Sequence, residues 1–142
     1  MQLTDAYDPQ NIFAKILRDE MPSIRVFEDE MTVAFMDIMP QAPGHVLIIP
    51  RAAATNVLTL QADDARAVMT TTHLLAPAVQ KAMDAPGLML AQLNGSAAGQ
   101  TVPHFHMHII PRREGLEMLG HGTKMADMDK LAEIAARIRA AI

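Results

Sequence analysis

A short segment near residue 105 alternates histidine with apolar residues, and it restricts the possible folds more than any other part of the chain. It runs His104-Phe105-His106-Met107-His108-Ile109-Ile110. Successive side chains of a β-strand point to opposite faces, so an extended segment places the three imidazoles on one face and Phe105, Met107 and Ile109 on the other. A slip of one residue would bury the histidines and expose the apolar side chains. We therefore expect a strand with one face in the core and one face at a site.

The remaining elements are predicted from hydrophobic periodicity and turn residues. Helical spacing follows Asn11 and extends from about Thr59 to Met83 and from about Asp127 to Ala141. The expected strands are 24–28, 32–37, 45–49, 88–93 and 104–110, separated by proline, glycine or charged residues. This order does not alternate as βαβ units do. It predicts an α+β domain whose antiparallel sheet has about five strands, with a long helix, a short N-terminal helix and a C-terminal helix. Residues 1–9 are polar and are expected to be loosely held.

Composition narrows the classes of function. The chain has 142 residues, half of them apolar, which suits one domain with its own core. A net charge of −4 with scattered basic residues disfavours a nucleic-acid polymer as partner. Cysteine is absent, so disulfides and thiolate zinc sites are excluded. Without an apolar run of roughly 20 residues or a secretory signal, we expect a cytoplasmic protein that does not bind membranes. The methionines are expected to fill the core.

Three histidines on one face permit two kinds of chemistry. In a metal site, each ligating histidine usually donates its second nitrogen to a carboxylate or carbonyl. Neighbouring same-face positions lie roughly 6–7 Å apart, and the segment contains no carboxylate, which weakens this alternative without removing it. In the other alternative, a neutral imidazole attacks phosphorus and forms a phosphoramidate, while its neighbours bind oxygens or protonate the leaving group. His106, with a histidine on each side, is the expected nucleophile.

Other polar residues are candidates for the site because of their positions relative to this strand. The loop of residues 94–101 is rich in Gly and small polar residues and leads into the histidines, so its N–H groups could bind an anion, although such loops are more often plain turns. His45 begins another strand, where an ordinary edge histidine is the commoner interpretation. Asp37 ends a strand, where it either caps a turn or accepts ribose hydroxyls. His73 and His121 are expected to have no functional role.

The histidine segment is similar to the His-φ-His-φ-His-φ-φ signature of the histidine-triad (HIT) superfamily, where φ is an apolar residue. Residues 12–22, 34–50 and 94–112 resemble the Hint branch, the histidine-triad nucleotide-binding proteins, and the similarity covers roughly residues 11–113. The resemblance implies a single HIT domain over residues 1–142, with its core at about 11–113 and a C-terminal tail and helix at 114–142. It also implies a homodimer whose sheets join across the interface, and no cofactor.

The resemblance further implies a reaction and a set of site residues. A purine nucleotide (AMP- or GMP-like) would lose an amine or similar group from its α-phosphorus through a nucleotidyl-histidine, as in a nucleoside phosphoramidate hydrolase. His106 matches the nucleophile, with His104 and His108 beside it at the phosphate and His45 as a supporting fourth histidine. Asp37 matches the ribose-binding acid. The purine slot matches Ile12, Phe13, Ile16, Phe35 and Ile38, and the phosphate loop matches Asn94, Gly99, Gln100 and Thr101.

The sequence departs from the family at a few points and leaves several functions open. Thr101 stands where many relatives have serine, and the tail after Arg113 matches little, which leaves the leaving group undefined. A dinucleoside polyphosphate hydrolase or a nucleotidyl transferase would share the same site. A nucleotide-binding or interaction protein without catalysis, and a metalloprotein using the three histidines, are the alternatives from other classes.

Overall fold

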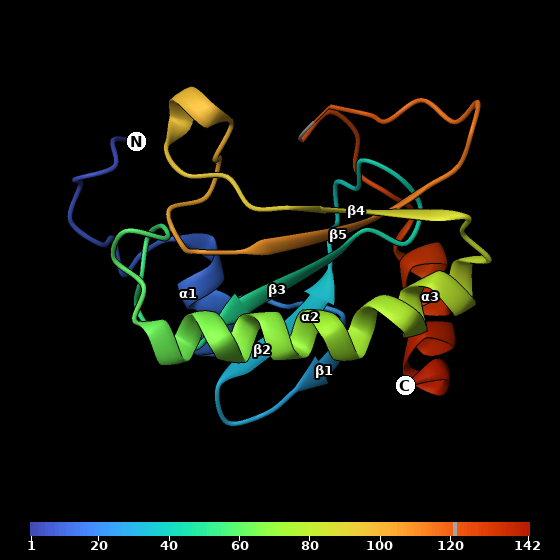
Figure 1. The fold of residues 1–142 in the computed structure, drawn as a ribbon, viewed down its shortest axis with the longest axis horizontal. Helices are drawn as coiled ribbons and strands as arrows, with labels where there is room; N and C mark the ends of the chain where they lie inside the picture. Colours follow the sequence, from blue (N-terminus) through green and yellow to red (C-terminus); the bar gives the residue numbers. More distant parts are fainter. Residues whose placement is uncertain (121) are drawn as a thin grey trace.

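A computed structural model describes residues 1–120 and 122–142, which form one five-stranded antiparallel sheet and three α-helices (Figure 1). The strand order is β1-β2-β3-β5-β4. This architecture confirms the predicted α+β class. His121 lies outside the described residues. The strands are β1 Arg25–Glu28, β2 Thr32–Met36, β3 Val46–Pro50, β4 Gly87–Ala91 and β5 Met107–Arg112, and the helices are α1 Ile12–Leu17, α2 Ala62–Met83 and α3 Met128–Ala141, with a 3₁₀ turn at Ser96–Ala98.

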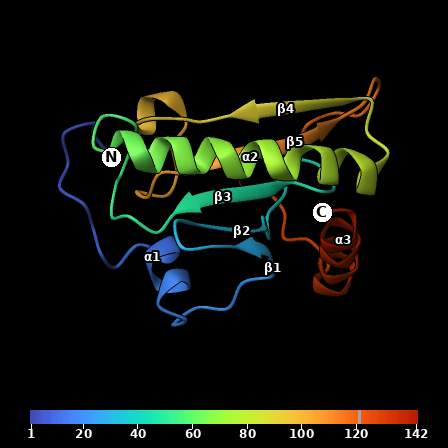
Figure 2. The ribbon, with the colours of Figure 1, turned by 60° about the horizontal axis from the view of Figure 1, so that its bottom comes forward.

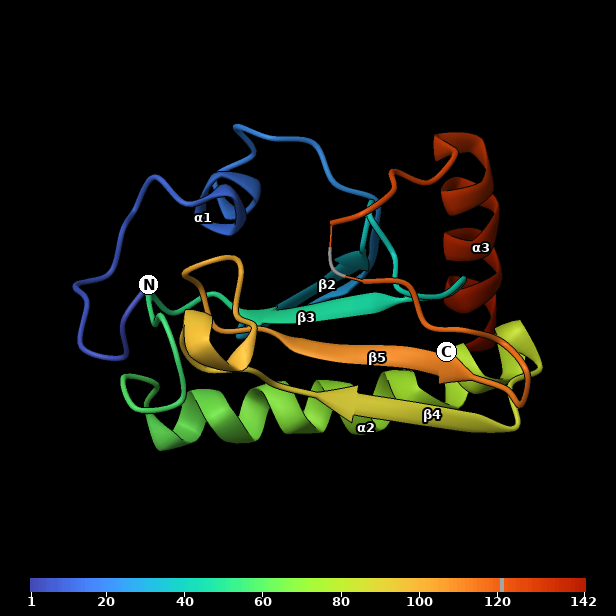
Figure 3. The ribbon, with the colours of Figure 1, turned by 90° about the horizontal axis from the view of Figure 1, so that it is seen from above.

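The two faces of the sheet carry separate hydrophobic clusters. The larger cluster joins the sheet to α2 and α3, and the smaller one joins it to α1. Figure 2 shows α2 lying along the sheet, and Figure 3 shows α1 on the opposite side from α2. In the β3–β5 register, Leu47 pairs with His108 and belongs to the α1-side cluster, whereas Val46 pairs with Ile109 and belongs to the α2-side cluster. The predicted alternation of imidazole and apolar faces is therefore confirmed at His108 and Ile109.

Local polar residues determine where the helices begin. Asn11 precedes α1, and its Oδ1 accepts a hydrogen bond from the N–H of Ala14 at 2.9 Å. Asp127 precedes α3 and accepts from the N–H of Asp129 at 2.9 Å. Both side chains satisfy donors that a helix start leaves without intrahelical partners. α1 ends at Leu17, well before Pro22.

The strand that carries the histidines begins later than predicted. β5 starts at Met107, so His104 and His106 lie on irregular backbone before it. The N–H of Phe105 donates to the carbonyl of Ala54 at 2.8 Å, outside the sheet. Pro50 at the end of β3 explains the early end of this ladder, because proline has no N–H to donate to a neighbouring strand. Sequence alternation alone therefore placed the first two histidines on a strand that does not reach them.

The first ten residues, here called the N-terminal arm, are anchored, and the prediction that residues 1–9 are loosely held is wrong. The carbonyl of Met1 accepts from the N–H of Ser96 at 3.1 Å, and the carbonyl of Leu3 accepts from Asn56 Nδ2 at 3.0 Å. Further along, the carbonyl of Pro9 accepts from Arg18 Nη1 at 2.8 Å. These contacts use main-chain carbonyls, which every residue offers, so no sequence pattern marks them.

Among the described helices, none combines the length and the apolar character that crossing a membrane requires.

Candidate active site

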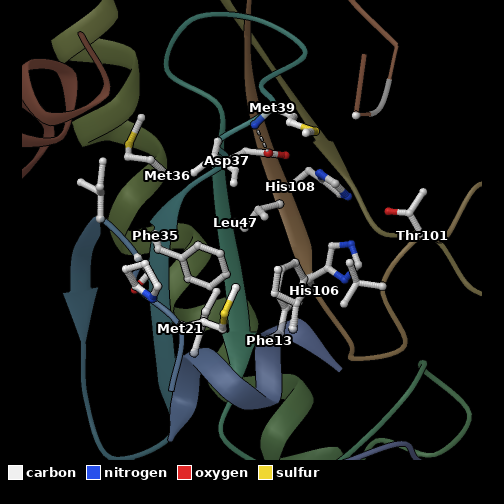
Figure 4. A pocket seen from close by; sticks show the side chains of 18 of the residues that line it. Phe13, Met21, Phe35, Met36, Asp37, Met39, Leu47, Thr101, His106 and His108 are labelled. Atoms are coloured by element: carbon white, nitrogen blue, oxygen red, sulfur yellow. Dashed lines mark hydrogen bonds between the residues drawn. The ribbon is translucent and has the colours of Figure 1, made fainter. Parts of the chain in front are cut away.

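A cavity of about 400 Å³ opens on the α1 side of the sheet, within the size range of small-molecule sites. One end is apolar, with Phe13, Met21 and Phe35 around it (Figure 4). The other end is polar, where His106 and His108 face Thr101 across the cavity. A ligand with a flat apolar part and an anionic part fits this division.

The structure brings most, but not all, of the predicted site residues to this cavity. Its lining includes the five predicted purine-slot residues, and also Asp37, Thr101, His106 and His108. The other predicted residues lie outside the lining; they are His45, His104, Asn94, Gly99 and Gln100. For these residues a direct contact with a nucleotide stays a prediction.

Methionines at the cavity are a feature that the sequence analysis missed. Met21, Met39 and Met128 line it, and Met128 is half exposed, so the expectation that the methionines fill the core is wrong for these positions. Methionine side chains are flexible and adapt to differently shaped ligands. No local pattern marks them, because they come from the segment after α1, the turn after β2 and the start of α3.

His106 is held with its ring edge toward Phe13. The two ring centroids are 5.0 Å apart and the planes are nearly perpendicular. His106 Nδ1 lies 2.6 Å from the carbonyl oxygen of His104. A carbonyl can only accept, so the proton of a neutral His106 is on Nδ1 and the lone pair is on Nε2. This tautomer makes Nε2 the nucleophilic atom.

The tautomer of His108 is set by two successive hydrogen bonds, the first of which comes from the main-chain N–H of Gln41. The N–H of Gln41 donates to His45 Nδ1 at 3.0 Å, so a neutral His45 carries its proton on Nε2. That Nε2–H donates to His108 Nδ1 at 2.8 Å. The proton of His108 is therefore on Nε2. At the cavity, His108 is consequently a hydrogen-bond donor rather than a base.

The backbone turn before β3 is what lets His45 reach this position. Gly44 has a backbone φ of +89°, a conformation that favours glycine. A Cβ at Gly44 would lie 2.6 Å from Cγ of Met83, so the turn also packs closely on α2. His45 itself is fully buried behind His108. His45 does not line the cavity itself and contacts residues that do.

His104 is fully buried, and both of its ring nitrogens are used inside the protein. Nε2 donates to the carbonyl of Pro50 at 2.8 Å, and Nδ1 lies 2.7 Å from the hydroxyl of Tyr7. Burial lowers the pKa of His104 below its ordinary value of 6.5, with the Pro50 carbonyl acting in the opposite sense. His104 is therefore neutral near pH 7. Tyr7 was missed by the sequence analysis, because nothing in the sequence links the arm to the histidine segment.

Asp37 lies at the rim of the cavity, close to His45. Its Oδ1 accepts from the N–H of Met39 at 2.9 Å, as predicted for a turn-capping aspartate, and its Oδ2 lies 3.5 Å from His45 Nδ1. One ligand atom each of Asp37, His45 and His108 falls within 4.8 Å of the others, the one such group found in the described part of the chain. Both ring nitrogens of His45 already take part in hydrogen bonds, Nδ1 with the N–H of Gln41 and Nε2 with His108, so the arrangement favours proton positioning over metal binding.

The loop before the histidines is built around the Gln100 side chain. Gln100 is buried; its Oε1 accepts from the N–H of Gly95 at 2.7 Å, and its Nε2 donates to the carbonyls of Thr55 (2.7 Å) and Val102 (3.0 Å). Asn94 forms a reciprocal amide pair with Gln92. These bonds hold the loop so that Thr101 reaches the cavity.

Comparisons with known proteins agree with this architecture. A family model described as HIT domain matches residues 18–115. The adenosine 5'-monophosphoramidase of Saccharomyces cerevisiae is 35% identical over 130 residues, covering 89% of this chain and 79% of that protein. The purine nucleoside phosphoramidase of Escherichia coli K12 is 37% identical over 113 residues, covering 79% of this chain and 95% of that protein. The crystal structure of a Hit-like protein involved in cell-cycle regulation from Bartonella henselae is 47% identical, with a TM-score of 0.90 over 96% of this chain and 100% of that one.

Proposed function

Because the chain belongs to the HIT domain family, we propose that it is a hydrolase that cleaves purine nucleoside phosphoramidates at the α-phosphorus through a nucleotidyl-His106 intermediate. The observation that carries the proposal is the hydrogen bond from His106 Nδ1–H to the His104 carbonyl, which puts the lone pair on Nε2. The names of the yeast and Escherichia coli relatives support the choice of a phosphoramidate.

The cavity suggests how the substrate is placed. The purine occupies the apolar end, against Phe13 and Phe35, and the ribose hydroxyls bind the Asp37 carboxylate. The α-phosphate then lies at the polar end, where His108 Nε2–H and the hydroxyl of Thr101 donate to its non-bridging oxygens. Binding the base and sugar fixes the phosphorus near the nucleophile, which lowers the entropic part of the barrier.

The reaction proceeds in two displacements at phosphorus. In the first, the lone pair of His106 Nε2 forms a P–N bond and the bond to the amine breaks, with the amine taking a proton from solvent. The positive charge on the His106 ring is stabilised by the His104 carbonyl at Nδ1. In the second, water attacks phosphorus, the His106 bond breaks and a proton returns to solvent. The products are the nucleoside monophosphate and the free amine.

Trapping the intermediate tests the proposal directly. The protein is mixed with an adenosine phosphoramidate, quenched in base and digested, and mass spectrometry locates the adduct. We expect it on His106. His106→Ala should still bind AMP but lose at least about a thousandfold in turnover. His73→Ala, at an exposed histidine of α2, is the matched control and should behave as wild type. Normal turnover by His106→Ala rejects the proposed role of His106. If wild-type protein cleaves diadenosine polyphosphate faster than the phosphoramidate, the polyphosphate replaces the phosphoramidate as the proposed substrate.

We also propose that the protein is a homodimer whose sheets join through β4. β4 is the last strand in the sheet order, and edge strands readily pair with another chain. Leu90 on β4 is 43% exposed, and on α2 Met69 is 49% and Leu74 is 42% exposed. Large apolar side chains exposed near an open sheet edge are typical of an association surface.

A further inference from the structure

Tyr7 of the N-terminal arm lies against the histidine segment from behind the cavity. Its hydroxyl oxygen is 2.7 Å from His104 Nδ1, and the two rings meet edge to face with centroids 5.6 Å apart. Tyr7 is partly buried, and it is the only tyrosine in the chain. It does not line the cavity. Tyr7 contacts the histidine segment through His104.

The direction of the Tyr7 hydrogen bond follows from the other partner of His104. The Pro50 carbonyl can only accept, so His104 Nε2 carries the proton in the neutral ring. Nδ1 then has the lone pair, and the Tyr7 hydroxyl is the donor. If the proton moved to Nδ1, the lone pair on Nε2 would face the Pro50 oxygen at 2.8 Å, which is repulsive. Donation from Tyr7 stabilises the tautomer that binds Pro50.

Tyr7 keeps the proton that this bond requires. Burial raises the pKa of the Tyr7 hydroxyl above its ordinary value of 10.0, and a hydrogen bond donated by the Asn11 side chain opposes the shift only in part. The hydroxyl is therefore un-ionised throughout the neutral range.

The nucleophile depends on His104 because the backbone here is irregular. His104 and His106 precede β5, so sheet hydrogen bonds do not hold them. The segment is held instead by the N–H of Phe105 on Ala54 and by the His104 ring between Tyr7 and Pro50. The His104 carbonyl in turn holds His106 Nδ1 at 2.6 Å. A shift of the His104 ring would move the acceptor that orients the nucleophile.

We propose that Tyr7 is a positioning residue for the nucleophile: its hydroxyl fixes the tautomer and orientation of His104, and His104 thereby holds His106 with its Nε2 lone pair toward phosphorus. The kinetic part of this inference rests on the proposed role of His106. The structural part, a Tyr7-dependent tautomer at His104, stands independently of any reaction.

The kinetic test is Tyr7→Phe, which removes the hydroxyl and keeps the ring. Loss of one hydrogen bond from a connected network corresponds to about a tenfold change. We expect kcat and the rate of nucleotidyl-His106 formation to fall about tenfold, with KM changed less than twofold. Asp5→Asn is the control in the same arm, because Asp5 makes an exposed bond to the N–H of Gln2 and does not touch His104. It should match wild type. An unchanged kcat in folded Tyr7→Phe overturns the proposal.

The spectroscopic test uses ¹⁵N-labelled histidine and NMR of the ring nitrogens. We expect His104 to carry its proton on Nε2 in the wild type, and the His104 and His106 resonances to move in Tyr7→Phe. Since Tyr7 is the only tyrosine, growth on 3,5-difluorotyrosine alters the donor at this one site. Measured below the lowered pKa of that phenol, the stronger donor should shift the His104 Nδ1 resonance in the direction opposite to Tyr7→Phe. If Tyr7→Phe does not fold, the fluorinated protein alone tests whether the Tyr7 hydroxyl acts on His104.

The two tests separate two kinds of failure. If the wild type forms no adduct on His106 but the ring resonances respond to Tyr7, the proposed function fails and the positioning contact holds. Resonances of His104 and His106 that are the same in wild type, Tyr7→Phe and the fluorinated protein overturn the positioning proposal, whatever the activity.

Discussion

The family resemblance places Gln100 in the phosphate loop. Replacing Gln100 with alanine tests whether its side chain supports the loop or binds the phosphate. Its side chain is 3% exposed and makes three hydrogen bonds of 2.7 to 3.0 Å to the main chain of Gly95, Thr55 and Val102. At about 1 kcal/mol each, loss of three such bonds should lower the free energy of unfolding by about 3 kcal/mol. For a chain of this length, the midpoint of thermal unfolding should fall by about 10 °C.

Urea unfolding, followed by circular dichroism at one fixed protein concentration, measures this change. The concentration must be fixed because a dimer links stability to concentration. Gln92→Ala is the matched control: Gln92 is the same residue type in the same region, but it is only partly buried, so water can replace its bonds to Asn94. It should cost less than about 1 kcal/mol.

The opposite pattern would refute the argument. If Gln100→Ala were as stable as wild type but bound AMP at least about tenfold more weakly, the side chain would be a phosphate ligand and not the support of the loop. If it were destabilised but bound AMP nearly as well at low temperature, the structural role would be established.

The remaining predictions concern pH and association. In the folded state His104 is neutral and has a lowered pKa, whereas in the unfolded chain it takes up a proton near pH 6.5. The free energy of unfolding should therefore fall as the pH drops below about 6.5. The same fall in the free energy of unfolding in wild type and His104→Asn would contradict this. Tyr7 has a raised pKa, so stability should also fall above pH 10, and the absorbance of the single tyrosine at 295 nm should titrate above its ordinary value of 10.0. Leu90→Arg should convert a dimer to monomers in sedimentation velocity. Leu58→Arg, at a leucine that is more exposed (68% against 43%) and outside β4, should leave it dimeric. A monomeric wild type would remove the dimer proposal.

The fold was predictable where side-chain pattern and burial agree. Alternation in the histidine segment predicted which side of the sheet His108 and Ile109 face, and the cap residues Asn11 and Asp127 marked two helix starts. The first residue of β5 was not predictable, because it depends on Pro50, a residue far away in the sequence that cannot extend the ladder. Strand pairing is a property of two segments, and one segment alone does not show it.

The candidate site was predictable in its residue types and less so in its connections. The family resemblance selected His106, His108 and Asp37, all of which line the cavity. The tautomers of His45, His104 and His108 follow from contacts with main-chain groups of Gln41 and Pro50, which leave no trace in a sequence. Tyr7 was missed for the same reason: its partner is almost a hundred residues away, and a lone tyrosine in a polar arm has no distinguishing pattern.

The two histidines that line the cavity are held by different parts of the molecule. His108 lies within β5, paired on both sides by β3 and β4, and its tautomer is set by the hydrogen bond from His45, just before β3. His106 lies just before the hydrogen-bonded part of β5. Its position depends on His104, which contacts the N-terminal arm and the end of β3. On the proposed roles, substitutions in the first ten residues would change the orientation of His106 without disturbing His108. The orientation of one ring and the tautomer of the other could then be changed separately in this chain.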